Sequence, residues 1–172
     1  YYAYGRKDQN SGKYQDGRTH YRLAAELYHA AAEMARSDSS IHSAEADTWV
    51  QIMELDKTQG LSPKEAYERA LDACDRAIVS FSDNDSAVRK KVWAMTRWAE
   101  YLRTHGQDPR PTARQAIETA QRAYAMNPNN AFPHHQIGLA YLTIAQYENE
   151  YGLDTGESEK RAIEAFQKSI EI

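Results

Sequence analysis

Hydrophobic and polar positions follow a helical period along most of the chain. Ile137, Tyr141 and Ile144 recur three to four residues apart, which is the spacing of one face of an α-helix. Ala162 and Phe166 continue this spacing in the last segment. A helix with one apolar stripe must bury that stripe against another helix. The pattern therefore predicts an all-α protein.

The same pattern returns every 46 residues without a gap. Three glycines, Gly60, Gly106 and Gly152, are in register at this spacing. Further columns in register are Trp49, Met95 and Tyr141; Leu55, Tyr101 and Tyr147; Ala70, Ala116 and Ala162; and Leu71, Ile117 and Ile163. Self-similarity at a fixed period is typical of stacked helical hairpins that share one continuous core.

Two joints divide each repeat into two helices. Each glycine suits a helix C′ position, where φ is positive. Good N-cap residues follow two positions later: Ser62, Asp108 and Asp154. Ser62 and Glu65 also have the capping-box spacing. The predicted helices span residues 85–105, 109–126, 131–151 and 155–172.

The repeats define one helical array with predicted boundaries along the chain. The boundaries are about 1–38 for a partial repeat, 39–84 and 85–130 for two repeats, and 131–172 for a truncated repeat. In the partial repeat, residues 1–5 align with the end of a first helix, residues 6–19 are expected to form a long joint, and a second helix is expected over about 20–36. We expect the chain to be a fragment of a larger protein.

The composition excludes or disfavours several kinds of binding surface and site. The 172 residues carry a net charge of −4, which disfavours a nucleic-acid or polybasic membrane surface. No apolar run approaches the roughly 20 residues needed to span a bilayer. The single Cys74 excludes an internal disulfide framework and a multi-cysteine metal site, and its column, shared with Phe166, predicts a buried position.

The last repeat carries a family resemblance. The run Asn127-Pro128-Asn129-Asn130-Ala131, then Ile137-Gly138-Leu139-Ala140-Tyr141, then Ala162, Phe166 and Ser169, resembles a tetratricopeptide repeat (TPR). The resemblance implies a TPR-like solenoid of helical hairpins in a right-handed superhelix. The 46-residue period is longer than the usual length of about 34. With the joint Gly106-Gln107-Asp108-Pro109, the long repeat resembles the region carboxy-terminal to bacterial eukaryotic-like Ser/Thr protein kinases.

The resemblance also implies a ligand groove lined by the first helices of successive repeats. Carried over position by position, the groove residues are Asp47, Val50, Arg89, Trp93, Thr96, Arg97, His135, Leu139 and Leu142, with Ser43 and Phe132 beside them. Arg89, Trp93 and Arg97 form one stripe at i, i+4 and i+8, which suits an acidic extended peptide. The alternative, that Trp93 packs between repeats and the arginines are solvated, stays open.

No catalytic set, cofactor motif or metal-ligand spacing is present, so the chain is expected to be non-catalytic. The favoured function is a scaffold that binds a protein or peptide in the groove, as a regulatory or substrate-recruiting region of a bacterial Ser/Thr kinase. The alternatives are a self-association module acting through the array ends and a small-molecule sensor. A cytoplasmic location is favoured, and an extracytoplasmic one follows if the parent protein has a membrane span before the repeats.

Overall fold

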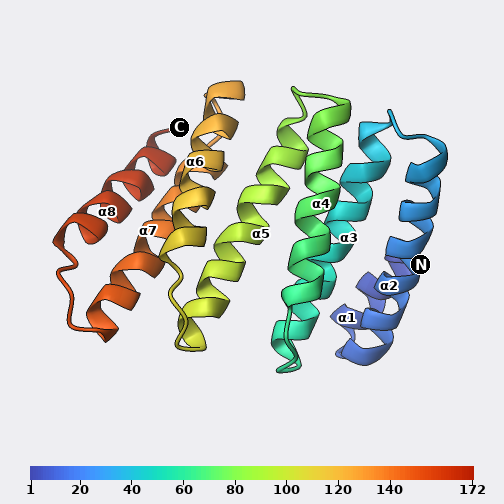
Figure 1. Ribbon diagram of the computed structural model, residues 1–172, viewed down its shortest axis with the longest axis horizontal. Coiled ribbons are helices and arrows are strands. Elements are labelled where there is room, and N and C mark those ends of the chain that lie inside the picture. Colours follow the sequence, from blue (N-terminus) through green and yellow to red (C-terminus); the bar gives the residue numbers. More distant parts are fainter. The chain divides into compact units, whose positions relative to one another are not determined.

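The computed structural model describes all 172 residues and consists of helices without any strand (Figure 1). The helices are α1 Tyr2–Asn10, α2 Tyr14–Met34, α3 Ser39–Thr58, α4 Lys64–Ser80, α5 Asp85–Thr104, α6 Arg110–Met126, α7 Phe132–Glu150 and α8 Gly156–Glu171. The all-α class is confirmed. The four helices predicted with explicit bounds, α5 to α8, agree with the structure to within one residue at each end.

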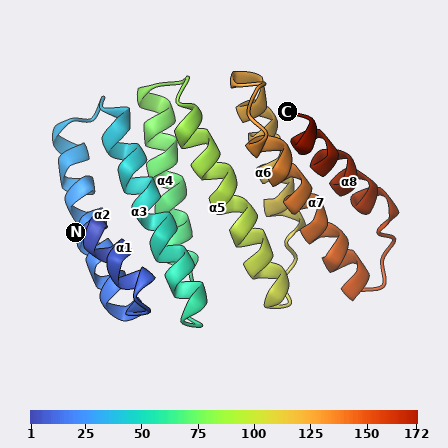
Figure 2. The same cartoon turned by 180° about the vertical axis from the view of Figure 1, so that it is seen from behind.

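The chain divides into two compact units, Tyr1–Lys90 and Lys91–Ile172. In the first unit, α1 packs on α2, α2 on α3 and α3 on α4. In the second unit, α6 packs on α7 and α7 on α8 (Figures 1 and 2). Sequential helices are therefore joined as hairpins, and each helix buries its apolar stripe against its neighbours in the chain.

A recurring C-terminal cap ends the first helix of each hairpin. Gly12, Gly60, Gly106 and Gly152 have φ values of 75°, 68°, 69° and 66°, a region that favours glycine. In each case the next residue donates its N–H to the carbonyl five residues earlier, as in a Schellman motif. These bonds are Lys13 N to Asp8 O at 2.8 Å, Leu61 N to Asp56 O at 2.8 Å, Gln107 N to Leu102 O at 2.9 Å and Leu153 N to Glu148 O at 2.8 Å.

The first helix of each following repeat begins with a polar capping residue at an equivalent position. The carboxylate or amide oxygens of Asp38, Asn84 and Asn130 accept backbone N–H bonds at the starts of α3, α5 and α7. The distances are 2.9 Å from Ser40 N, 2.9 Å from Ala87 N and 3.0 Å from Phe132 N. Successive caps are 46 residues apart, so the helix caps repeat with the same period as the apolar core positions.

The caps predicted for the second helices are present in two of three cases. Asp108 and Asp154 accept from the N–H groups of Arg110 and Gly156, both at 3.0 Å. The Ser62–Glu65 capping box is wrong. Glu65 instead accepts from Arg22 Nη2 of α2 at 2.6 Å, because an opposite charge on the neighbouring helix competes for its carboxylate.

The predicted joint over residues 6–19 is also wrong. Helix α1 continues through Gly5 to Asn10, and α2 already begins at Tyr14. Gly5 does not end a helix, because it allows close packing: a Cβ there would lie 2.8 Å from Tyr21 Cδ1. The helix end is at Gly12 instead. The polar residues of this stretch cover the exposed faces of two helices.

The core of the second unit is built mainly from alanine and isoleucine. Its buried members are Val92, Ala99, Ala113, Ile117, Ala120, Ile137, Ala140, Ile144 and Ala165. Small side chains let helices approach closely, and Gly138 of α7 leaves no room for a side chain. A Cβ on Gly138 would lie 2.6 Å from the Phe166 ring of α8.

We therefore expect Gly138→Ala to lower the free energy of unfolding by about 1–3 kcal/mol, because the added methyl overpacks against Phe166. Urea unfolding followed by circular dichroism measures the loss. The control is Phe166→Leu alone and combined with Gly138→Ala. The double variant should lose less stability than the sum of the single variants, and full additivity would contradict the proposed contact.

Candidate functional site

A small hollow opens between α5 and α7 in the second unit. Its volume is about 140 Å³. The lining residues are Thr96, Arg97, Glu100, Arg103, Leu139, Leu142, Thr143 and Gln146. Four of them, Thr96, Arg97, Leu139 and Leu142, are predicted groove residues. The two walls are equivalent positions of successive repeats, since Thr96 and Leu142 are 46 residues apart, as are Arg97 and Thr143.

The buried polar side chains of the hollow already have hydrogen-bond partners within the protein. Thr96 and Thr143 are buried, and their hydroxyls donate to the carbonyls of Val92 and Leu139, each at 2.9 Å. Because those hydrogens are used inside the helices, the two hydroxyls need no acceptor from a ligand. Leu142 is 38% exposed and adds accessible apolar surface. This arrangement suits an aliphatic side chain.

Basic groups line the α5 wall. Arg97 Nη1 lies 3.3 Å from Glu100 Oε2, and the Arg97 guanidinium also lies over the Trp93 ring, 5.5 Å from its centroid. Arg103 pairs with Glu150 of α7. Two guanidiniums and one carboxylate line the hollow, and Glu150 offsets the charge of Arg103, so Arg97 is the guanidinium nearest to the apolar part that can receive a ligand carboxylate. A guanidinium held against an aromatic ring is well placed to bind a carboxylate.

The other predicted groove residues are not among the lining residues of this hollow. In the first unit, Arg89 Nε pairs with Asp85 at 2.9 Å, Val50 is 5% exposed, and Asp47 accepts from the Tyr2 hydroxyl. In the second unit, His135 is exposed, with its ring 5.6 Å from Phe166. The structure thus brings together four of the nine residues.

Asp47 and Ser43 line a separate hollow in the first unit. Its volume is about 570 Å³. The other lining residues are Ser39, Ser40, Ala44, Phe81, Asn84, Ser86 and Lys90. The Asn84 amide, which caps α5, also donates to Ser43 Oγ at 3.0 Å. The polar side chains here already have hydrogen-bond partners, some of them within the hollow and others, such as Tyr2 and Asp38, outside it.

Sequence reasoning missed four residues of the α5–α7 hollow: Glu100, Arg103, Thr143 and Gln146. The repeat itself contains a signal for one of them. Thr143 occupies the column of Arg97, so extending that groove column to the next repeat would have found it. Gln146 occupies the column of Glu100, which was itself missed.

Other chemically notable residues lie in packing positions. Cys74 is fully buried beside Ala46 and Ala73, which confirms its predicted core position. The His134 ring lies 4.4 Å from Tyr124, and burial, aided by Lys168, lowers the pKa of His134 below its ordinary value. No group of three or more His, Cys, Asp or Glu side chains is arranged to hold a metal ion. No helix combines the length and apolarity required to cross a membrane.

The hairpins, their caps and the glycine-to-aromatic packing define a TPR-like helical-hairpin protein. A solved structure of MamA, a TPR-like protein, described as MamA MSR-1 C2, matches with a TM-score of 0.53 and 15% identity over 97% of this chain and 91% of that chain. A second, described as a crystal structure of MamA, has a TM-score of 0.43 and 16% identity over 97% and 92%. No family model and no curated protein matches the chain. The first likeness shows the fold.

The half-buried position of Trp93 makes its role measurable. We expect Trp93→Ala to lower the free energy of unfolding by about 1–2 kcal/mol, because its ring is only partly removed from water. Ile144→Ala, in the core of the same unit, should cost about 2–5 kcal/mol. Urea titrations of both variants provide the comparison. Equal losses would place Trp93 in the core and remove it from the groove.

Proposed function

We propose that this chain is a non-catalytic interaction scaffold that binds an extended peptide segment across α5 and α7. The observation that supports this proposal is the hollow in which Thr96, Arg97, Leu139 and Leu142 come together. Helices of about 20 residues present such a surface in a preformed state, so little ordering entropy opposes binding.

The lining predicts the chemistry of the peptide. The volume of 140 Å³ corresponds to a few water molecules at about 30 Å³ each, and so to one aliphatic side chain. Leu139 and Leu142 supply the apolar contact, and Arg97 lies beside them to receive a carboxylate. The proposed ligand is a segment in which an aliphatic residue adjoins an acidic one. Trp93 would extend this surface along α5.

A role as a recruiting region of a bacterial Ser/Thr kinase remains part of the proposal. Its support is the 46-residue repeat with the Gly106 to Pro109 joint. In such a role, the hollow would hold a substrate or regulator near a catalytic domain located elsewhere in the parent protein.

To test the peptide proposal, a random peptide library is displayed and selected on the immobilised chain. Selected sequences should pair an acidic with an aliphatic residue. For a selected peptide, fluorescence anisotropy should give a dissociation constant that rises at least about tenfold in Arg97→Glu, because a charge-assisted bond becomes a repulsion.

The matched control is Arg122→Glu, which makes the same charge change at an exposed position of α6. This variant should bind the selected peptide like the parent chain. If both variants bind equally well, or if selection yields no acidic sequence, the α5–α7 hollow is not the binding site.

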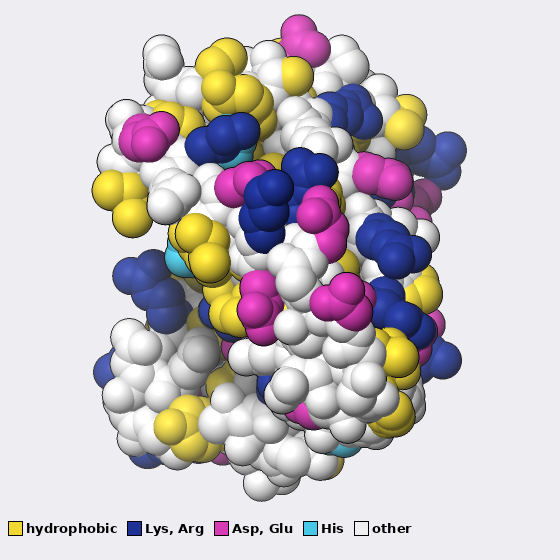
Figure 3. All heavy atoms as spheres, turned by 90° about the vertical axis from the view of Figure 1, so that its left-hand side faces the viewer, with side chains coloured by type: hydrophobic (Ala, Val, Ile, Leu, Met, Phe, Trp, Pro, Cys, Tyr) yellow, Lys and Arg dark blue, Asp and Glu magenta, His cyan; other side chains and the backbone are white.

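Self-association is a second candidate, supported by exposed apolar side chains on α8. Ile163 and Ile170 are 58% and 84% exposed, although Ile163 belongs to the same repeat column as the buried Ile117. Figure 3, viewed from the side on which α8 lies in Figure 1, shows hydrophobic side chains in separate groups among acidic and basic ones. A continuous apolar surface would favour association more strongly.

If α8 mediates self-association, the weight-average mass measured by sedimentation equilibrium should rise with concentration. Ile163→Glu should abolish that rise by placing a charge in the contact. The control Gln121→Glu alters an exposed position of α6 and should leave it unchanged. A constant monomer mass for the parent chain would rule this candidate out.

A further inference from the structure

One face of α2 leaves a row of apolar side chains exposed. Leu23, Leu27, Ala30 and Met34 follow one another at i, i+4, i+7 and i+11, so they form a single stripe along the helix. All four are exposed, and Met34 is 88% exposed. Helix α1 packs on α2 at Tyr21, before the stripe begins. These four residues, the α2 stripe, are therefore open to solvent.

The other second helices are charged where the α2 stripe is apolar. In the later repeats, the column of Leu23 holds Arg69, Gln115 and Arg161, and the column of Ala30 holds Arg76, Arg122 and Lys168. Five of these six side chains are cationic, as is usual for a helix edge in water. Helix α2 has apolar side chains at both columns instead. A continuous exposed apolar surface of this kind marks a contact surface.

Helix α8 exposes isoleucines at two different columns of the repeat. These are Ile163 and Ile170, which lie seven residues apart on one face and are both exposed. In α2 the same columns hold Ala25 and Ala32, which are fully buried, and α2 packs on the helix that follows it, α3. In α6 the column of Ile163 holds Ile117, a buried member of the core. The α8 face, defined by its two isoleucines, is thus equivalent to buried positions of α2 and α6.

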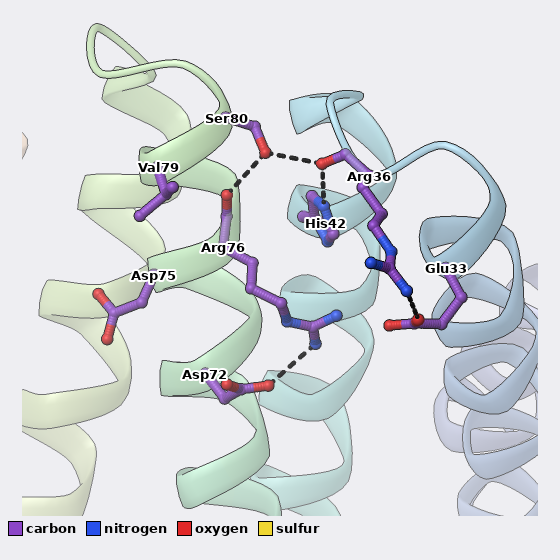
Figure 4. Close-up of a pocket in the computed structure, with 8 residues that line it drawn as sticks. All are labelled: Glu33, Arg36, His42, Asp72, Asp75, Arg76, Val79 and Ser80. Carbon is purple, nitrogen blue, oxygen red and sulfur yellow. Dashed lines mark hydrogen bonds and ion pairs between the residues drawn. The ribbon is translucent and has the colours of Figure 1, made fainter.

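A pocket between α2 and α4 shows which carboxylates of α2 are already paired (Figure 4). Its volume is about 530 Å³. Its ionised side chains pair with one another, Arg36 with Glu33 at 2.9 Å and Arg76 with Asp72 at 3.0 Å. Two carboxylates lie within the length of the α2 stripe, Glu26 and Glu33. Since Glu33 is neutralised by Arg36, Glu26 is the one that can attract a cation of a partner.

The α8 face has an ionised side chain of opposite sign beside it. Lys160 lies one turn before Ile163, and it is exposed and makes no ion pair within the chain. Glu26 lies one turn after Leu23 and is likewise exposed and unpaired. The two apolar surfaces are therefore flanked by complementary charges, which favours their contact over the contact of either surface with itself.

On the basis of the self-association candidate, we propose that the α8 face binds the α2 stripe of a second copy, so that chains associate head to tail. In a parallel alignment of the two helices, Ile163 lies beside Leu27 and Ile170 beside Met34, because both pairs are seven residues apart. The flanking lysine of α8 and glutamate of α2 then lie on the same side of the contact.

The contact uses a different surface on each copy. Every associated chain therefore keeps one surface free for a further copy, and growth continues beyond a dimer. One helix packed against one helix buries less than the roughly 800 Å² per partner of a standard complex. The association is consequently expected to be weak and to depend strongly on concentration.

Sedimentation equilibrium of the full chain over a range of concentrations provides the first readout. The weight-average mass should rise past twice the monomer mass of 19.6 kDa. Leu27→Glu and Ile163→Glu should each abolish this rise, because each places a carboxylate in an apolar contact. The control Gln15→Glu introduces the same charge at an exposed position of α2 outside the stripe and should leave the rise unchanged.

A mixture of the two variants distinguishes a head-to-tail contact from other modes of self-association. The Leu27→Glu chain keeps its α8 face, and the Ile163→Glu chain keeps its α2 stripe. An equimolar mixture should therefore form dimers, although neither variant associates alone. The mass of the mixture should not exceed that of a dimer, because the second contact of each chain is blocked.

The charged pair is tested by reversal. Glu26→Lys and Lys160→Glu should each raise the dissociation constant about fivefold, since an attraction becomes a repulsion. A chain that carries both substitutions has the two charges exchanged and should regain the affinity of the parent chain. Failure of the double variant to regain that affinity would contradict the pairing of these two residues.

The outcomes separate this proposal from the self-association candidate. A parent chain that stays monomeric at every concentration would overturn both. If the parent associates and Leu27→Glu associates equally well, α8 binds another surface and only the head-to-tail contact is wrong. Mixed variants that stay monomeric lead to the same conclusion, since mixing cannot restore a contact of α8 with α8. Peptide binding at the α5–α7 hollow is independent of these results, because no residue of α2 or α8 lines that hollow.

Discussion

The left-handed glycine at the end of each first helix is the constraint on which the rest of the structure depends. Gly60, Gly106 and Gly152 fix where α3, α5 and α7 end, and the caps at Asn84 and Asn130 fix where two of them begin. Helices with the same start and the same end present equivalent positions at the same level. The α5–α7 hollow follows directly, because its facing walls are equivalent positions one period apart.

The two units bury different kinds of side chain. The second unit packs alanine and isoleucine around Gly138, with only a few buried hydroxyls and one buried amide. The first unit instead buries two carboxylates of α3, Glu45 and Asp56, which pair with Arg76 and Arg18 of the neighbouring helices. A buried ion pair tolerates few substitutions, since removing one partner leaves an uncompensated charge.

The fold was predictable at positions where a residue has only one structural role. Periodic apolar residues and capping groups located α5 to α8, since both signals recur in register. Prediction failed where one residue type serves two purposes: Gly5 allows contact with Tyr21 rather than a turn, and Glu65 pairs with Arg22 rather than capping α4. The hollow was only partly predictable for a related reason. The family resemblance assigns groove positions to each first helix separately. The lining of a hollow between two helices also depends on how those two helices pack against each other.

The two hollows differ in the helices that build them. The α5–α7 hollow is lined by Arg97, Arg103 and Glu100, and Arg103 pairs in turn with Glu150 of α7. In the pocket between α2 and α4, the ionised side chains pair with one another, Glu33 with Arg36 and Asp72 with Arg76. This difference follows from which helices form each wall: first helices build the hollow, and second helices build most of the pocket.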